Sequence, residues 1–231
     1  MSPIFKVAID AMGGDFAPRA PVEGAVLASR HENTEVFLVG DVDKVQAELA
    51  NFDSAGLPIT VIPSKGKIED HEPPALALRQ KPEASILVAT GLVKKGLADA
   101  VISMGSTGGT MAAAVIILGT IEGIERPAIG GPIVGSAPNQ TILDLGSNID
   151  CKAAQLLGFG VLGSVFSSVL LQIKNPRIAI LSIGSEEGKG NALAREATEL
   201  FKNSGLNFIG NVEGNDLATG KADVVVCDGF V

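Results

Sequence analysis

Residues 4–15 read IFKVAIDAMGGD, and this stretch decides the fold class. Its first part, residues 4–10, predicts a β-strand that ends in a carboxylate. A glycine pair at residues 13–14 then predicts a turn. Pro18 is tolerated in a first helical turn, so a helix can run from about residue 20 to residue 31. The stretch therefore predicts one strand–turn–helix unit.

The same alternation of strands and helices continues along the chain. It implies right-handed βαβ units with a mostly parallel sheet that is covered on both faces. We therefore expect an α/β fold, with residues 1–231 forming a single three-layer α/β/α domain that looks truncated at its C-terminal end. The further predicted strands are 35–39, 59–62, 98–103, 141–145, 177–183 and 223–227, and the further helices are about 42–50, 84–95, 110–121, 151–173 and 191–203.

Composition excludes several classes of function. The 231 residues carry a formal net charge of −8 and include no Trp or Tyr, so we expect no nucleic-acid partner. Two cysteines and two histidines make neither a disulfide framework nor a histidine-based metal cluster, and we expect no metal. No secretory signal is visible, which favours a cytoplasmic setting. The uncharged runs 101–121 and 153–173 are expected to be buried helices rather than membrane spans.

The strand exits carry the strongest functional signal. In open parallel sheets, ligands bind beyond the C-terminal ends of the strands. Here these ends are polar and rich in glycine, and we expect six of them to converge on one rim. They are residues 10–15, 103–109, 144–150, 182–191, 213–216 and 228–229.

Residues 105–109 are a candidate anion site on this rim. Their small side chains let the backbone approach a ligand, and Ser106 or Thr107 can cap a helix whose free N–H groups favour a phosphate. An ordinary strand-to-helix turn explains the same residues. Lys189 is the cation within these motifs, and it either binds an anion or offsets Glu186 and its neighbour in solvent.

Four aspartates near the strand ends could ligate a metal or exchange protons, but Asp also forms turns and helix caps. Asp150 stands where a cap for the helix at Cys151 belongs. Asp10 and Asp144 lie at strand ends, and we consider them functional candidates, with Asp15 beside them.

Two further motifs are given structural explanations. Residues 158–163, GFGVLG, match a dinucleotide-binding pattern but lie inside a helical run, where close helix packing explains the glycines. Cys151 and Cys227 could form an acyl-enzyme only with a nearby activating histidine, and both histidines lie far away in sequence.

In this order the motifs resemble those of the bacterial phosphate acyltransferases that act on acyl carrier protein, the PlsX family. Glu69, Pro73, Arg79, Lys81 and Ser85 match a further block of that family, whereas Gly109 and Ser147 stand where its members usually carry Ala. The motifs that carry the resemblance are residues 8–18 (AIDAMGGDFAP), 104–108 (MGSTG), 144–151 (DLGSNIDC), 184–191 (GSEEGKGN) and 227–230 (CDGF).

The resemblance implies a fold similar to that of isopropylmalate dehydrogenases and phosphate acetyltransferases, usually as a homodimer. It implies that inorganic phosphate, a substrate rather than a cofactor, cleaves acyl-[acyl carrier protein] to acyl-phosphate and free carrier protein. A downstream membrane glycerol-3-phosphate acyltransferase would use the product in phospholipid biosynthesis. Family members continue beyond residue 231, and that part is thought to bring them to the membrane surface.

The resemblance also implies a candidate site. Phosphate is itself the nucleophile, so the protein must position it and stabilise an oxyanion. The catalytic candidates are Asp10, Ser106, Asn148 and Lys189, and the substrate- or phosphate-binding candidates are Gly13, Gly14, Asp15, Gly105, Thr107, Gly108, Asp144, Asn191 and Asp228. The acidic carrier protein would dock on a local basic patch, for which the candidates are Arg79, Lys81, Lys94 and Lys95.

Three alternatives stay open at this point. A phosphate acyltransferase could use coenzyme A thioesters instead of the carrier protein. A nicotinamide-dependent dehydrogenase could share the fold, although no glycine fingerprint follows a strand with an acidic residue about 20 positions later. A non-catalytic regulator would bind acyl groups and release no acyl-phosphate.

Overall fold

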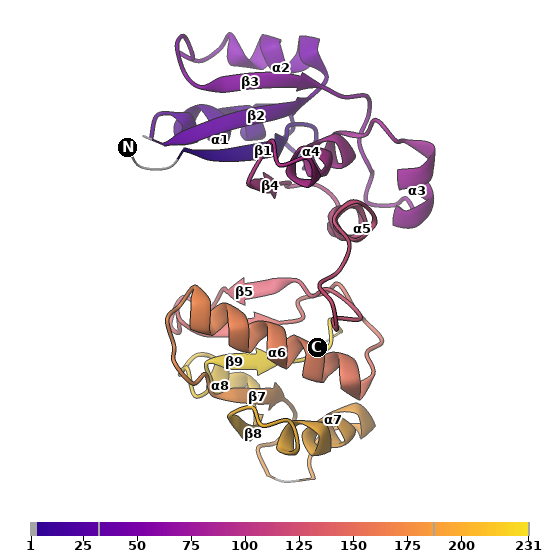
Figure 1. Cartoon of the computed structure of the whole chain (residues 1–231), viewed down its shortest axis with the longest axis vertical. Helices are drawn as coiled ribbons and strands as arrows, with labels where there is room; N and C mark the ends of the chain where they lie inside the picture. The colour runs from indigo at the N-terminus through magenta and orange to yellow at the C-terminus, as the bar shows by residue number, and fades with distance from the viewer. Residues whose placement is uncertain (1–3, 32, 187, 231) are drawn as a thin grey trace. The chain divides into compact units, whose positions relative to one another are not determined.

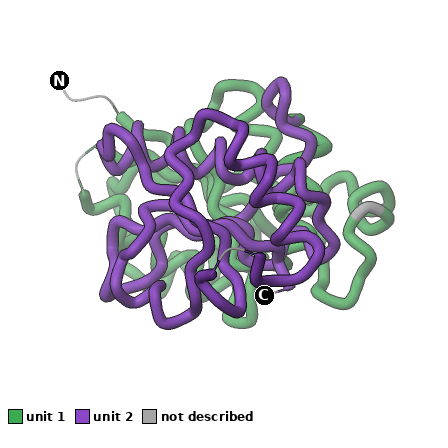
Figure 2. Tube along the Cα trace, turned by 90° about the horizontal axis from the view of Figure 1, so that it is seen from below, with its two compact units in different colours: residues 1–119 green, residues 120–231 purple. Residues whose placement is uncertain are grey.

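The computed structural model describes residues 4–31, 33–186 and 188–230. Within them the chain divides into two compact units, residues 1–119 and residues 120–231, shown in different colours in Figure 2. Each unit has a β-sheet of its own. Glu187 of the motif 184–191 lies outside the described residues, as does Val231, which follows the motif 227–230.

Unit 1 contains a parallel sheet of four described strands in the order β3-β2-β1-β4 (Figure 1). Ile9 in the central strand faces Leu38 on one side and Ile102 on the other. The strands are β1 (Phe5–Asp10), β2 (Thr34–Gly40), β3 (Ile59–Pro63) and β4 (Ala100–Ile102). The helices are α1 (Arg19–Ser29), α2 (Val42–Leu49), α3 (Pro74–Gln80), α4 (Ser85–Lys94) and α5 (Thr107–Ile117).

Helices cover both faces of this sheet. Successive strand residues point to opposite faces of the sheet. Ile9 packs with Val22 of α1 and Val45 of α2 on one face. The preceding residue, Ala8, packs with Ala89 of α4 on the other face. Such two-sided burial is typical of parallel sheets. Unit 1 therefore has the three layers expected of an α/β/α sandwich.

Unit 2 contains a sheet of five described strands in the order β5-β6-β9-β7-β8, in which only the edge strand β5 is antiparallel. Helices α6 and α7 pack on one face through Leu156, Phe159 and Phe201. The strands are β5 (Gly130–Pro132), β6 (Thr141–Leu143), β7 (Ile178–Leu181), β8 (Phe208–Val212) and β9 (Val224–Val226), and the helices are α6 (Ala153–Val169), α7 (Ala192–Lys202) and α8 (Gly214–Leu217).

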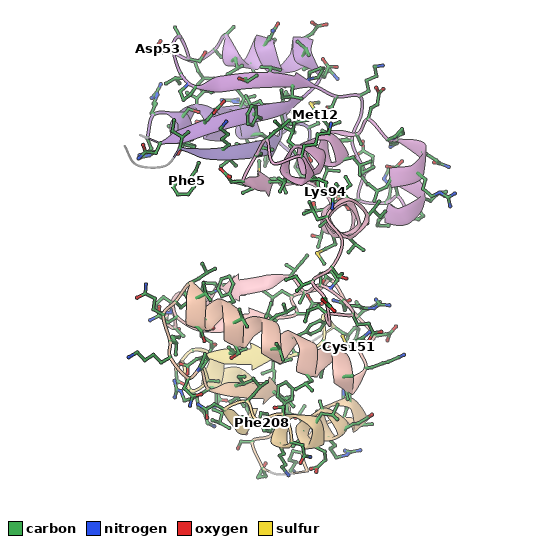
Figure 3. The ribbon with its side chains drawn as sticks, in the orientation of Figure 1. Phe5, Met12, Asp53, Lys94, Cys151 and Phe208 are labelled. Atoms are coloured by element: carbon green, nitrogen blue, oxygen red, sulfur yellow. The ribbon has the colours of Figure 1, made fainter. Side chains whose placement is uncertain are left out.

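The opposite face of this second sheet is covered more thinly. Ala179, Val225 and Cys227 pack there with Val134 from a loop and Leu217 from the short helix α8. On the helical face, Phe208 stacks on Phe201 with ring centroids 5.0 Å apart (Figure 3). The larger part of the apolar packing in unit 2 therefore lies between its sheet and the helices α6 and α7.

The glycines of the GFGVLG motif lie within α6, as predicted, and two of them, Gly160 and Gly163, pack closely. A Cβ on Gly160 would lie 2.6 Å from Cζ of Phe201, and a Cβ on Gly163 would collide with Val224 of β9. The helix can approach the sheet and α7 only where these side chains are absent.

The α/β class with mostly parallel strands is confirmed. The expectation of one sheet is wrong, because β1–β4 and β5–β9 form separate sheets. That the strand exits converge on one rim stays a prediction. Whether residues 1–231 act as a single domain stays a prediction. The runs 101–121 and 153–173 contain α5 and α6, and none of the described helices is long and apolar enough to cross a membrane.

Candidate functional site

The predicted site residues fall into two groups, one in each unit. Unit 1 holds the ends of β1 and β4, with residues 10–15 and 103–108, and unit 2 holds the ends of β6, β7 and β9. Each group is built around a buried aspartate at the end of a strand, Asp10 as the last residue of β1 and Asp144 directly after β6.

In unit 1, the carboxylate of Asp10 holds two turns together. Asp10 is 3% exposed, and its Oδ2 accepts a hydrogen bond of 2.8 Å from Oγ of Ser103. Its Oδ1 accepts one of 3.1 Å from the backbone N–H of Met12. Oγ of Ser103 accepts in turn from the backbone N–H of Gly105 at 3.0 Å. Asp10 thus fixes its own turn and, through Ser103, the turn after β4.

The glycines of these turns are required by close backbone packing. A Cβ on Gly13 would lie 2.6 Å from Oδ2 of Asp10 and 2.8 Å from the backbone nitrogen of Gly105. Gly14 has a φ of +95°, which side chains disfavour, and a Cβ there would lie 2.9 Å from the carbonyl oxygen of Met104. The two turns can touch only because these positions lack side chains.

The second of these turns leads directly into α5. Ser106 is the N-cap residue, and its Oγ accepts a hydrogen bond of 3.3 Å from the backbone N–H of Gly109. The first N–H groups of a helix have no partner within the helix and carry a partial positive charge. The hydroxyl of Ser106 therefore serves the helix, and the backbone of Thr107 and Gly108 supplies donors suited to an anion.

A cavity of about 200 Å³ lies beside this helix start. The polar loop between β3 and α3 forms one of its walls. Lys67 is the cation in that wall, and its Nζ lies 3.3 Å from Oε2 of Glu69. The lining residues are Gly14, Asp15, Lys67, Ile68, Glu69, Asp70, Met104, Gly105 and Ser106. The structure thus brings together predicted residues from both turns and adds Lys67 to them.

In unit 2, Asp144 plays a role parallel to that of Asp10. It is 1% exposed, and its Oδ1 accepts from the backbone N–H of Ile129 at 2.9 Å and from Oγ of Ser147 at 2.6 Å. Its Oδ2 accepts from the backbone N–H of Asn148 at 2.6 Å and from Nδ2 of Asn148 at 3.0 Å. Four donors compensate the burial of this carboxylate.

Asn148 extends this network to the last turn of the chain. Its Nδ2 also donates to the carbonyl of Pro127 at 2.9 Å, and its own carbonyl accepts from the backbone N–H of Gly229 at 2.8 Å. A Cβ on Gly229 would lie 2.7 Å from Cα of Gly146. Asp228, just before this glycine, accepts from the N–H of Phe230 at 3.2 Å. The loops after β6 and β9 are therefore one packed structure.

The exit of β7 leads to Lys189 and Asn191. Oδ1 of Asn191 caps α7 by accepting from the backbone N–H of Ala194 at 2.8 Å. A cavity of about 440 Å³ with mostly apolar walls lies beside this cap, and Asn191 lines it whereas Lys189 does not. Lys189 is exposed between Gly188 and Gly190, both of which have positive φ.

Both cysteines are poor nucleophiles. Burial raises the pKa of Cys227 to about 12, with the charges of Asp228 and Asp144 adding to the shift. Burial and the same two carboxylates raise the pKa of Cys151, which precedes α6, to about 11 (Figure 3). Both thiols are protonated at neutral pH, and the thiolate is the reactive form.

Three smaller predictions concern a cap, a metal and a basic patch. The prediction that Asp150 caps a helix is wrong, because α6 begins later, with Lys152 at its N-cap. In the part of the chain that the structure describes, no group of three or more His, Cys, Asp or Glu residues could hold a metal ion. Of the docking candidates, Arg79, Lys94 and Lys95 are exposed, whereas Lys81 is held by Glu72 at 2.7 Å.

No motif in the sequence points to Lys67, and Ser103 is predicted only as the first residue of the rim segment 103–109. Lys67 lies in the polar connection between β3 and α3, and loops on a rigid scaffold often carry function. Ser103 precedes the glycine-rich turn, but its hydrogen bond to Asp10 spans 93 positions in the chain. Such a contact depends on the pairing of β1 with β4, which no local pattern specifies.

A family described as fatty acid synthesis protein matches residues 5–231 of the chain. A phosphate acyltransferase of Pelotomaculum thermopropionicum is 47% identical over 226 residues, which cover 98% of this chain and 66% of that protein. A phosphate acyltransferase of Syntrophomonas wolfei is 47% identical over 232 residues, with 97% and 71% covered. The chain thus spans about two thirds of the length of these curated relatives.

Solved structures show the same fold at lower identity. A phosphotransacetylase from Streptococcus pyogenes superimposes with a TM-score of 0.70 at 20% identity, covering 98% of this chain and 78% of that one. The EutD phosphotransacetylase from Staphylococcus aureus superimposes with a TM-score of 0.62 at 19% identity, covering 96% and 77%. The predicted similarity to the phosphate acetyltransferase fold is confirmed.

Proposed function

The chain belongs to the fatty acid synthesis protein family, and from this we propose that it is a phosphate acyltransferase. Its substrates would be a fatty acyl-[acyl carrier protein] and inorganic phosphate, and its products acyl-phosphate and free carrier protein. The relatives that are 47% identical carry the name phosphate acyltransferase, which supports this assignment.

One observation in unit 1 carries the proposal. Two glycine turns, held by Asp10 and Ser103, lie beside the start of α5 and open on a cavity of about 200 Å³. Backbone N–H groups at a helix start bind anions without any cationic side chain. The site therefore suits inorganic phosphate, with Lys67 and the helix start offsetting the carboxylates of the cavity wall.

The reaction needs little covalent chemistry from the protein. An oxygen of phosphate attacks the thioester carbon, the carbon–sulfur bond breaks, and the thiol group of the carrier protein leaves with a proton. Preorganised donors such as the backbone N–H groups of Thr107 and Gly108 would stabilise the negative charge on the acyl oxygen or on phosphate. The protonated state of both cysteines agrees with a direct attack that forms no acyl-enzyme.

The residues of unit 2 are proposed to serve the thioester substrate. The apolar cavity of about 440 Å³ beside Asn191 suits an acyl chain, and Lys189 next to it would contribute a positive charge. Asp144 and Asn148 hold their loops in place and would act as positioning residues. Asp228 belongs to the same packed pair of loops.

The test is to trap the product with hydroxylamine, which converts an acyl-phosphate into a stable hydroxamate. Hydroxylamine also cleaves thioesters directly, so a reaction without enzyme gives the background. With a long-chain acyl-[acyl carrier protein] and enzyme, hydroxamate should form faster than this background only when inorganic phosphate is added. A matched acyl-coenzyme A in a parallel reaction separates the two thioester classes. A protein that binds the acyl substrate but forms no hydroxamate at any phosphate concentration would instead be an acyl-lipid regulator.

The finer parts of the proposal concern assembly and location. We expect a homodimer in the cytoplasm that receives its substrate from acyl carrier protein. Arg79, Lys94 and Lys95 are exposed and stay candidates for the docking patch. Longer relatives would contact the membrane peripherally and pass acyl-phosphate to a membrane acyltransferase.

A further inference from the structure

The wall formed by Lys67, Ile68, Glu69 and Asp70 decides the shape of the cavity in unit 1. These residues belong to the long connection between β3 and α3 rather than to a helix or strand. A wall of this kind keeps its shape only if side chains tie it to the rest of the unit. Two such side chains are those of Lys81 and Glu72.

Lys81, the residue after α3, forms hydrogen bonds with Lys67 at the start of this wall and with Glu72 just beyond its end. Its Nζ donates to Oε1 and Oε2 of Glu72 at 2.7 Å each and to the backbone carbonyl of Lys67 at 3.1 Å. The ammonium group has three donors, and all three are used in these contacts. With its side chain 33% exposed, Lys81 is partly shielded from water.

Glu72 closes the wall from the other side. Its Oε2 also accepts a hydrogen bond of 2.9 Å from the backbone N–H of Glu69, and the backbone N–H of Glu72 donates back to the carbonyl of Glu69 at 3.1 Å. These bonds bend residues 69–72 into a compact turn. The Glu72–Lys81 pair thus joins Lys67 at one end of the wall to this turn at the other.

The middle of the wall is fixed against the start of α5. Ile68 is 6% exposed and packs where Gly109 lacks a side chain, since a Cβ on Gly109 would lie 3.1 Å from Cγ2 of Ile68. Any movement of the wall is therefore passed to the first turn of α5. Lys81 is not among the residues that line the cavity, so its effect on the cavity must be indirect.

We propose that Glu72 and Lys81 are positioning residues, which hold residues 67–70 in the shape that lets the cavity beside α5 bind inorganic phosphate. This inference rests on the proposed function, because it takes phosphate as the ligand of that cavity. It gives Lys81 a role inside unit 1 in place of the carrier-protein docking that its charge suggests.

The experiment compares the wild-type chain with Lys81→Met and Glu72→Gln. Binding of inorganic phosphate is measured by titration calorimetry, and hydrogen exchange is measured for peptides that cover residues 64–73. Both variants should bind phosphate about 10- to 100-fold more weakly, and their wall peptides should exchange at least about tenfold faster. In the hydroxylamine assay, the KM for phosphate should rise by a similar factor while kcat changes less than about threefold.

Two further variants serve as controls. Lys65→Met removes a cation from the same connection, but its partner Glu83 and Lys65 itself are 63% and 82% exposed, so this variant should behave as wild type. Lys81→Arg keeps donors for the carboxylate of Glu72 and for the carbonyl of Lys67, and it should recover most of the phosphate affinity. A purely structural role would give lower thermal stability without this pattern.

The outcomes separate this inference from the proposed function. A wild-type chain whose phosphate affinity falls on substitution of Lys81 or Glu72, but which forms no hydroxamate, would refute the acyltransferase proposal and leave the positioning role intact. Unchanged phosphate affinity in both variants, unchanged exchange of the wall, or no binding of phosphate by the wild type would each overturn the positioning role.

Discussion

Asp10 ends β1, Asp144 directly follows β6, and both direct their carboxylate oxygens at neighbouring turns. Asp10 accepts from Met12 and Ser103, and Asp144 accepts from four donors in its own and an adjacent loop. Neither carboxylate has the exposure expected of a group that exchanges protons with a substrate. We therefore assign both a positioning role in the proposed reaction.

The substitution Gly13→Ala should damage the site in unit 1. Its Cβ would lie within 2.8 Å of three atoms, of Asp10, Ser103 and Gly105, so the two turns must separate. Overpacking of this kind costs about 1–3 kcal/mol of unfolding free energy. Chemical denaturation measures this loss, and phosphate-dependent hydroxamate formation should fall more than about tenfold. A variant with normal turnover would show that the contact between the turns is dispensable.

The two cysteines should resist alkylation in the folded protein. The raised pKa values, about 11 for Cys151 and about 12 for Cys227, keep both thiols protonated at pH 8. Iodoacetamide labelling followed by mass spectrometry should be slow in buffer and fast in denaturant. Rapid labelling of native protein would contradict the burial of Cys227.

The same shifts make stability depend on alkaline pH. A thiol with a raised pKa favours the folded state at pH values below its ordinary pKa of 9.0. This contribution should fade as the pH rises from about 9 through the folded values. Urea denaturation at pH 8 and pH 10 should therefore show lower stability at pH 10, and a double Cys→Ser variant should show less of this loss.

The sequence predicted the positions of the site residues more accurately than it predicted their roles. Asp10, Ser106 and Asn191 were expected near the site, and the structure uses all three to hold turns or cap helices. The role of a carboxylate depends on the hydrogen-bond donors around it. For Asp10 one of these donors is Ser103, which lies 93 positions away in the chain, and no motif reveals this contact.

In helix α6, as in the turns of unit 1, the role of a glycine depends on the atoms that face it. Its glycines are of two kinds, because a Cβ on Gly160 would meet Phe201, whereas a Cβ on Gly158 would meet nothing within 4 Å. Glycine inside a helix costs stability unless close packing requires it. Only one of the two therefore has a structural purpose.

The pair Gly158→Ala and Gly160→Ala tests this difference. Gly158→Ala should stabilise unit 2 by about 0.5–1 kcal/mol, since alanine restricts the unfolded chain. Gly160→Ala should destabilise it by about 1–3 kcal/mol, since α6 and α7 must move apart. Thermal and urea unfolding of both variants gives the comparison. Equal effects of the two substitutions would contradict the packing of α6 on Phe201.

The missed elements are short or contain unusual strand residues. Strand β5 is Gly-Gly-Pro, and β8 contains Gly210 with a φ of +94° and an irregular register against β7. Both lie at sheet edges, where pairing on one side is enough to hold them. The longer strands and helices followed the predicted alternation because local pattern and burial agree there.

At the scale of the whole molecule, each unit closes its own sheet and its own core. All partners of β1, β2, β3 and β4 lie within residues 1–119. The sequence predicted one sheet because alternation specifies the order of elements and not which strands pair. Pairing is decided by contacts between distant segments, such as that of β1 with β4.

Residues 1–119 expressed alone should therefore fold. A chain of this length can bury a sufficient core, and no strand of its sheet would be lost. Circular dichroism should show an α/β spectrum with cooperative unfolding, and amide resonances should be dispersed. The fragment 1–99 lacks β4 and α5 and should fail the same tests. Disorder in both fragments would mean that unit 1 depends on the remainder of the chain.

The bond between Asp10 and Ser103 has a thermodynamic consequence for ligand capture. Three hydrogen bonds among Asp10, Met12, Ser103 and Gly105 tie the two loops together without any contribution from a ligand. An incoming anion then spends little of its interaction enthalpy on ordering the backbone, and the entropic penalty of association is reduced. A small anion can be bound for this reason, although it has few atoms with which the protein can form contacts.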